Sequence, residues 1–251
     1  MTTAQPLWRA YVAFLMPMML SNILQALFGT INGIYLGQMI GVDALAAVSI
    51  FFPVMFFFIS FIIGLGAGSS VLIGQAWGAR ASEKVKTIAG TTLTLTLIGG
   101  CVIAVGGGLF ARQLLVALAT PPNVLDAATS YARIMMITMP ATFTFLLAAS
   151  MMRGVGDTVT PLWALVLSTA IGLIVTPALI RGWFGLPQLG VASAAVASTV
   201  SSIVTLLWLG LHTRHMNHPL APDAVFFRAM RFARELLGKG LRIGLPTAIQ
   251  L

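Results

Sequence analysis

The sequence has very few charged residues. Of its 251 residues, 8% are Asp, Glu, Lys or Arg, whereas about a quarter are charged in a soluble globular domain. So few charges cannot cover the exterior of a soluble fold of this size. Together with 58% hydrophobic residues and a mean hydropathy of +0.97, this scarcity excludes a water-soluble enzyme, a nucleic-acid-binding domain and a disordered chain. It predicts a membrane protein.

Cysteine and catalytic motifs are also scarce. The one cysteine, Cys101, lies in an apolar run, so an intrachain disulfide is excluded. The sequence contains no HExxH, phosphate-binding loop, CxxC or nucleophile elbow. The apolar runs hold no Asp, Glu, Lys, Arg or His at mid-depth that could act as an acid or a base. We therefore expect no enzyme activity, no cofactor and no metal site.

The charged residues divide the chain into long uncharged runs. About twenty apolar residues suffice for a helix to cross the hydrocarbon of a bilayer. The runs do not alternate as barrel strands do, so only helices can satisfy their backbone groups in lipid. The first run has no small-residue cleavage site before it and is interpreted as a retained span. The sequence predicts an all-α membrane protein with six transmembrane helices, at 12–38, 45–72, 88–111, 128–150, 160–180 and 187–211.

Lys and Arg are distributed unevenly among the gaps between these spans. Eleven fall in one set of gaps and three, Arg112, Arg133 and Arg181, in the other. Because Lys and Arg favour cytoplasmic loops, this bias predicts a multi-pass protein with a cytoplasmic N-terminus. The net charge of +8 then reflects topology, and no nucleic-acid partner is expected.

Three segments are predicted along the chain. Residues 1–211 form a six-helix lobe, and 212–241 form a cytoplasmic amphipathic linker in which Arg228, Arg231 and Arg234 alternate with apolar residues. Residues 242–251 begin a seventh apolar run, in which Pro246 echoes the position of Pro17. We expect a half-length or truncated chain whose second half repeats the first, as in transporters built from parallel repeats.

The first span carries two patterns. Gly29, Gly33, Gly37 and Gly41 recur every fourth residue and predict a smooth ridge that another helix approaches closely. An adjoining polar strip suits a helix that lines a wet cavity. Alternatively, these amide side chains hold neighbouring helices together by hydrogen bonds. The strip consists of Asn22, Gln25, Asn32 and Tyr35.

Two further groups of residues lie near the ends of spans. His212, His215 and His218 follow helical spacing, which favours a solvated loop cluster over a metal site because no carboxylate or thiol joins them. Asp157 and Thr158 precede the fifth span and are expected to cap it.

Several stretches resemble the multidrug and toxic compound extrusion family of cation-coupled antiporters. The resemblance runs in order over about 17–211 and rests on four motifs. They are the first-span run Asn22…Gln25…Asn32-Gly33-Ile34-Tyr35-Leu36-Gly37, then Gly74-Gln75-Ala76-Trp77-Gly78-Ala79, then Met152-Arg153-Gly154-Val155-Gly156-Asp157-Thr158, and finally Leu189-Gly190 with the small residues that follow.

The resemblance implies twelve spans in two six-helix lobes around a cavity that opens alternately to each face of the membrane. Lipophilic or cationic drugs would leave a bacterial cell across its inner membrane as H⁺ or Na⁺ enters. The implied partners are the bilayer, a small organic substrate and a C-terminal six-helix lobe.

The resemblance also implies a set of cavity residues, and the chain departs from the family at some of them. The family commonly has an aspartate at Asn32, and one branch has an Asn and an Asp at Gly172 and Thr176; Phe28 stands at a tyrosine position. Asn32 does not titrate, so coupling here differs from the family pattern. The predicted substrate and ion cavity is Asn22, Gln25, Phe28, Asn32, Tyr35, Gly172 and Thr176.

Two other functions remain open from the sequence. One is a lipid-linked saccharide flippase of the same superfamily, which the absence of Lys and Arg at mid-span disfavours. The other is a membrane-embedded assembly protein, or a fragment, without transport activity.

Overall fold

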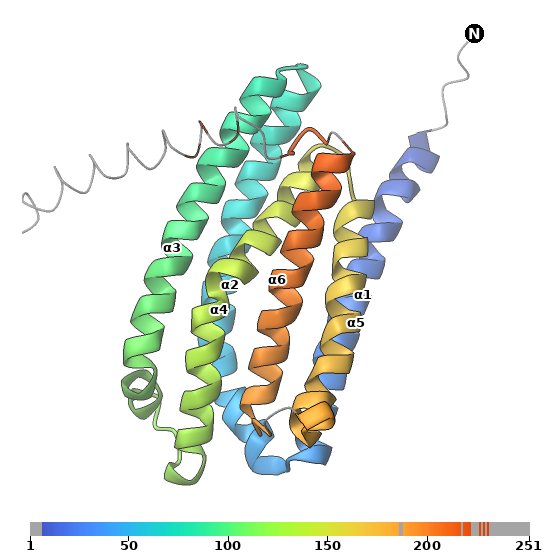
Figure 1. Cartoon of the computed structure of the whole chain (residues 1–251). Helices are drawn as coiled ribbons and strands as arrows, with labels where there is room; N and C mark the ends of the chain where they lie inside the picture. The colour runs from blue at the N-terminus through green and yellow to red at the C-terminus, as the bar shows by residue number, and fades with distance from the viewer. Residues whose placement is uncertain are drawn as a thin grey trace, which may run out of the picture.

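The computed structural model describes residues 7–185, 188–216, 218–221, 226, 228 and 230. Six long helices follow one another and run along the length of one bundle (Figure 1). All six are long and apolar enough to cross a membrane, which confirms the predicted spans. They are α1 (Leu7–Met39), α2 (Val42–Gly78), α3 (Ser82–Ala117), α4 (Pro122–Gly154), α5 (Val159–Arg181) and α6 (Ala192–His215), with a short 3₁₀ helix, η1 (Trp183–Gly185), between the last two.

The helix ends differ from the prediction by a few residues. Five of the six helices begin earlier than expected, because polar and charged residues at the interface continue the helix beyond its apolar part. The sixth begins five residues later, at Ala192 instead of 187. Gly182 ends α5 in a left-handed conformation with φ of 69°, and Gly190 has a φ of 54°, so the chain between them turns before it can resume a helix. The first residues of the predicted linker, 212–215, belong to α6, and most of the linker beyond 221 lies outside the described residues, as does the whole predicted start of a seventh span, 242–251.

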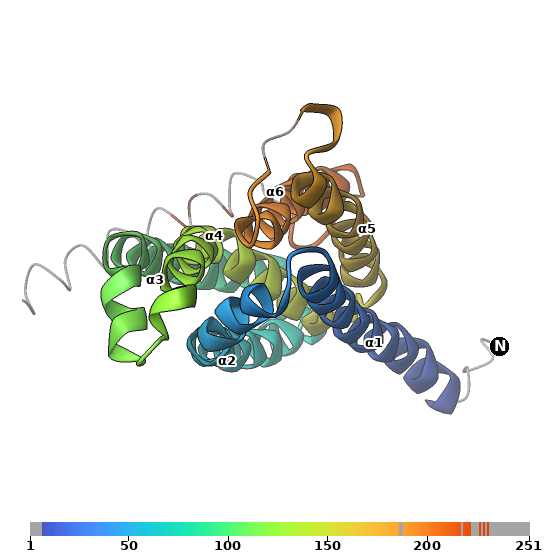
Figure 2. The ribbon, with the colours of Figure 1, turned by 90° about the horizontal axis from the view of Figure 1, so that it is seen from below.

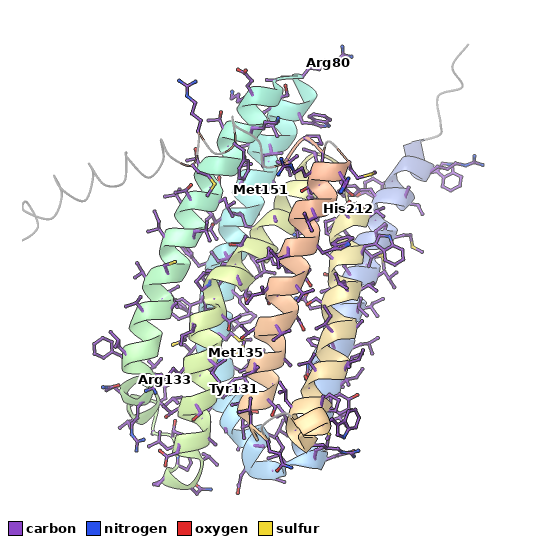
Figure 3. All side chains as sticks on the ribbon, viewed as in Figure 1. Arg80, Tyr131, Arg133, Met135, Met151 and His212 are labelled. Atoms are coloured by element: carbon purple, nitrogen blue, oxygen red, sulfur yellow. The ribbon has the colours of Figure 1, made fainter. Side chains whose placement is uncertain are left out.

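Helix α4 lies at the centre of the bundle. It packs against α2, α3 and α6, while α5 packs against α1 and α6. Seen along the bundle, α1 and α2 lie on one side and α5 and α6 on the other (Figure 2). The labelled Arg80 and Arg133 lie toward opposite ends of the bundle, and the labelled Met135 and Met151 lie on α4 between the ends (Figure 3). This separation follows from the cost of placing charges in hydrocarbon.

Glycines on α2, α3 and α4 let these helices approach closely. A methyl group at Gly100 of α3 would lie 2.8 Å from Pro140 Cα on α4, and one at Gly154 of α4 would lie 2.6 Å from the Ser70 carbonyl oxygen on α2. Both distances are far below van der Waals contact. Small residues therefore set the spacing of α2, α3 and α4, as is usual for helices packing in lipid.

The predicted glycine ridge of α1 is wrong as a packing surface. A methyl group at Gly29, Gly33, Gly37 or Gly41 would meet nothing within 4 Å. Helix α1 instead approaches α5 through the face that carries Phe28, whose ring lies against Gly172. Four-residue spacing identifies a smooth face, but it does not identify the neighbour that covers it.

Asp157 joins two loops at one end of the bundle. Its Oδ1 accepts hydrogen bonds from the backbone N–H groups of Val159 and Thr160, each at 3.0 Å. This confirms that it caps α5. Its Oδ2 lies 3.3 Å from Nε2 of His218, and the Nδ1 of His218 accepts a hydrogen bond from the N–H of Leu220. The segment after α6 is thereby fixed to the α4–α5 loop.

The ionisation of Asp157 contributes to this junction. Burial by itself raises the pKa of Asp157, but hydrogen bonds from His218 and Thr160 and attraction to His218 hold that pKa below its usual range. Because the pKa of Asp157 is lower in the folded protein than in the unfolded chain, its ionised form stabilises the fold. This stabilisation is fully present at pH values above the pKa of Asp157 in the unfolded chain. It is lost as the pH falls through the pKa of Asp157 in the folded protein.

Gly100→Ala should lower the free energy of unfolding by roughly 1–3 kcal/mol, because the added methyl group meets the backbone of Pro140. The matched control is Gly99→Ala on the same helix, where a methyl group meets nothing within 4 Å. Denaturation of the purified protein in detergent measures both variants. Equal losses would contradict the close approach of α3 and α4.

Asp157→Ala should lower the free energy of unfolding by about 1 kcal/mol at neutral pH, through loss of the helix cap. The difference in the free energy of unfolding between this variant and the wild type should shrink below about pH 4, where an aspartate in an unfolded chain becomes protonated. Thermal unfolding in detergent across this pH range is the measurement. Asp126→Ala is the control, because Asp126 forms an exposed ion pair with Arg112, which contributes little. A difference that does not change with pH would rule out the role of the Asp157 charge.

Candidate functional site

A cavity of about 790 Å³ lies among five of the six helices. This volume is in the range of pockets that hold drug-sized molecules. Helices α1, α2, α4, α5 and α6 all contribute to its wall, whereas α3 is shielded from it by α4. The lining residues are Phe14, Met18, Asn22, Gln25, Phe28, Met55, Ile59, Ile63, Ala67, Ser70, Met135, Thr142, Phe145, Leu146, Ser150, Arg153, Leu165, Ser168, Thr169, Ser198, Ser201 and Ser202.

The cavity wall is apolar on one part and rich in hydroxyl groups on another. Methionine, phenylalanine and branched aliphatic side chains supply a flexible, polarizable surface. Serines and a threonine of α5 and α6 face them, and the hydroxyls of Thr169 and Ser201 are buried without a hydrogen-bond partner among the described residues. Such a wall suits a lipophilic guest that also carries polar groups.

Charge is nearly absent from this wall. Arg153, in the last turn of α4, is its single charged residue, and the described lining contains no carboxylate. Arg153 falls between the predicted spans 128–150 and 160–180 and is not among the predicted cavity residues. The signal was weak, because an arginine at the end of a span usually reaches the membrane interface.

Three of the seven predicted cavity residues line this cavity. Asn22, Gln25 and Phe28 follow one another along α1 on its wall. Tyr35, nearer the end of α1, is partly buried and does not belong to the lining. That these four residues of α1 bind a substrate or an ion stays a prediction.

The other predicted residues meet where α1 contacts α5. The hydroxyl of Thr176 donates a hydrogen bond to Oδ1 of Asn32 at 3.2 Å, and Thr176 is almost completely buried. One turn away, the Phe28 ring lies so close to Gly172 that a methyl group there would sit 2.5 Å from its Cζ. The structure thus brings together Phe28, Asn32, Gly172 and Thr176, which the sequence placed on two separate spans.

The three histidines do not form one cluster. His212 stacks on Trp208 with ring centroids 4.8 Å apart, His215 is exposed at the end of α6, and His218 contacts Asp157. The interpretation of His218 as a solvated loop residue is wrong, since its side chain is 13% exposed. Within the described ranges, no three His, Cys, Asp or Glu residues lie where one metal ion could bind them.

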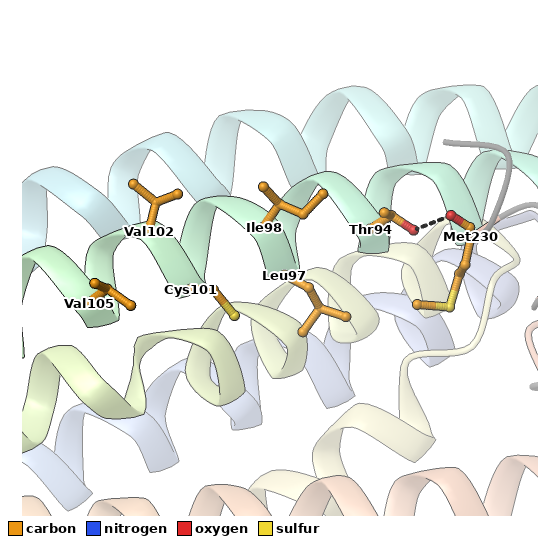
Figure 4. A pocket seen from close by; sticks show the side chains of 7 residues that line it. All are labelled: Thr94, Leu97, Ile98, Cys101, Val102, Val105 and Met230. Carbon is orange, nitrogen blue, oxygen red and sulfur yellow. Dashed lines mark hydrogen bonds between the residues drawn. The ribbon is translucent and has the colours of Figure 1, made fainter. Parts of the chain in front are cut away.

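A second hollow, of about 760 Å³, lies on the outer face of α3 (Figure 4). Leu97, Ile98, Val102 and Val105 line it beside the exposed Cys101. At its end the hydroxyl of Thr94 lies 3.4 Å from the carbonyl oxygen of Met230. With so apolar a lining on the outside of the bundle, this groove suits contact with lipid.

The comparison with known families decides the family of the chain. Residues 17–178 match the family model described as MatE, which is well over half of the chain. The chain belongs to the MatE family. The match begins within α1, includes α2–α4 and most of α5, and therefore covers both sides of the Asn32–Thr176 contact.

Relatives and solved structures of the MatE family extend this match to nearly the whole chain. The chain is 43% identical over 244 residues to the probable multidrug resistance protein YoeA of Bacillus subtilis. The aligned residues make up 97% of this chain and 53% of YoeA. It is 21% identical to the multidrug export protein MepA of Staphylococcus aureus, over 52% of that protein. Both relatives are named as proteins of drug resistance or export, and not as enzymes.

Among solved structures, a MATE protein in complex with MaL6 superposes with a TM-score of 0.79 at 28% identity. The superposed residues make up 94% of this chain and 51% of the MATE chain. An outward-facing MATE transporter of the MOP superfamily gives a TM-score of 0.75 at 26% identity, over 96% and 52%. The chain spans about half the length of these relatives, so its six-helix bundle corresponds to one lobe of such a transporter.

Thr176→Val should lower the free energy of unfolding by about 0.6 kcal/mol, the average for a hydrogen bond between helices in a membrane. The two side chains have the same shape, so the change isolates the bond to Asn32. Combined with Asn32→Ala in a double-mutant cycle, the two losses should not add. Unfolding in mixed detergent micelles measures the cycle, and full additivity would mean that this bond does not stabilise α1 against α5.

Proposed function

We propose that the chain is one lobe of a cation-coupled multidrug antiporter that exports lipophilic or cationic organic compounds by alternating access. One observation carries the proposal: a cavity of about 790 Å³ among five membrane-crossing helices, in a MatE-family chain whose relatives are named for multidrug resistance. The mixture of apolar and hydroxyl-bearing side chains is suited to guests of varied shape. A C-terminal lobe would close the cavity from the other side.

The proposed setting is the cytoplasmic membrane of a bacterium, with the N-terminus in the cytoplasm. The end of the bundle that carries Arg80, Lys84 and Lys86 would then face the cytoplasm, in accord with the preference of Lys and Arg for that side. The Asp157–His218 junction lies at the same end. A guest from the cytoplasm would enter past Arg153.

The driving ion is proposed to be H⁺ or Na⁺. Each charge that moves inward releases about 2.3 kcal/mol per 100 mV of membrane potential. Asn32 and Thr176 hold the positions where the family resemblance places acids, and their mutual hydrogen bond joins α1 to α5 without a titratable group. We propose that this contact keeps a structural role in the lobe, and that the ion binds elsewhere in the transporter.

The test uses energised inverted membrane vesicles that contain the protein and a fluorescent lipophilic dye. Ser202→Phe should abolish gradient-dependent dye transport because it fills the cavity that Ser202 lines. Ser60→Phe is the matched control, since Ser60 is exposed on α2 outside the lining. Absence of transport by the wild type would favour a non-transporting assembly protein. Equal activity of the two variants would show that the cavity is not the route.

Asn32→Asp should give dye transport a new pH dependence. Position 32 is partly buried in α1, and the substitution places there a group that can take up and release a proton, which Asn32 cannot. Transport rates measured from pH 5 to pH 8 should therefore change more steeply than in the wild type. Asn123→Asp, at the exposed start of α4, controls for added negative charge. An unchanged profile would count against any coupling role at position 32.

A further inference from the structure

Arg153 is a positively charged residue on the cavity wall. It lies in the last turn of α4 and lines the cavity, partly buried. Among the described residues its guanidinium group has no hydrogen bond and no ion pair. Asp157, four residues further on, is already engaged, because its two oxygens accept from the α5 backbone and contact His218.

A guanidinium group in this position favours an anionic guest. It carries five N–H donors and no acceptor, and a charge removed from water is costly unless it is paired. Carboxylate, sulfonate and phosphate groups match its planar fork and form two hydrogen bonds with it at once. The described wall contains no carboxylate that could pair with Arg153, and the acidic group of a guest would supply one.

Two hydroxyl groups extend this polar end of the cavity. Ser150 precedes Arg153 by three residues and therefore lies on the same face of α4. Ser70 of α2 lies beside this end of α4, because the carbonyl oxygen of Ser70 is close to Gly154, the residue after Arg153. Both serines line the cavity. Phe14, Met18 and Leu165 line the same cavity, so its wall offers apolar surface for the body of a guest with an acidic head.

We propose that Arg153 forms an anion subsite with the hydroxyls of Ser70 and Ser150, and that this lobe binds anionic or zwitterionic amphiphiles through their acidic group. The proposal rests on the proposed function and, among its lipophilic substrates, selects those that carry an acidic group. An acidic group can belong to a soluble amphiphile or to the headgroup of an anionic lipid, and the chemistry that Arg153 recognises is the same in both.

Two pyrene probes with head groups of opposite charge test the subsite: 4-(1-pyrenyl)butyrate and 4-(1-pyrenyl)butyltrimethylammonium. Their affinities for the protein in phosphatidylcholine nanodiscs are measured by energy transfer from tryptophan to pyrene, with empty nanodiscs subtracted. The wild type should bind the butyrate more tightly than the ammonium compound. Arg153→Gln should weaken butyrate binding roughly ten-fold or more, the effect of losing hydrogen bonds to a charged group, and leave ammonium binding unchanged.

Two variants control this result. Arg153→Lys keeps the charge and should retain part of the preference for the butyrate. Arg133→Gln removes an exposed arginine on the same helix, outside the cavity lining, and should change neither affinity. The proposal is overturned if the wild type shows no preference for the butyrate, or if Arg153→Gln weakens both probes equally.

A second arm distinguishes the source of the acidic group. Phosphatidylglycerol is added to the nanodiscs in increasing proportion. Competition with the butyrate in the wild type but not in Arg153→Gln identifies a lipid headgroup as the occupant, and no competition identifies a soluble amphiphile. The measurement needs no ion gradient. Failure of vesicle transport with intact binding would therefore refute the proposed antiporter and leave the subsite standing.

Discussion

Every backbone N–H and C=O group that crosses the membrane must be hydrogen-bonded inside the protein, because lipid offers no partners. The six long helices are the response to this constraint, and the remaining features of the fold follow from it. Charged side chains gather toward the helix ends, and many buried hydroxyls bond to the carbonyl four residues earlier, as Thr92 and Thr129 do. What remains for tertiary structure is the choice of which helix faces meet.

That choice is made largely by small residues. Gly100 and Gly154 allow α3 and α2 to reach the backbone of α4, so α4 becomes the centre of the bundle. Helices α1 and α5 meet instead through Phe28 against Gly172 and through the bond between Thr176 and Asn32. The helices α1, α2, α4, α5 and α6 leave a cavity of about 790 Å³ between them.

The chemistry of this cavity bears on what the lobe binds. Its wall combines methionines and phenylalanines with serine and threonine hydroxyls, and Arg153 gives one end a positive charge. The mixture of flexible apolar side chains and hydroxyl groups gives a surface that can fit guests of more than one shape. Arg153 places one positive charge on a wall whose other described residues are uncharged.

The sequence by itself determined the six helices, their order and the cap at Asp157. Long uncharged runs have one stable form in lipid, and a cap depends on residues a few positions apart. The spacing in the sequence also placed Asn22 and Gln25 on one strip of α1, and both line the cavity. Tertiary structure alone decided that no described residue covers the glycines of α1, that His218 contacts Asp157, and that Arg153 lines the cavity. Each of these depends on which neighbour a helix face meets, and periodicity along one helix carries no information about a residue on another.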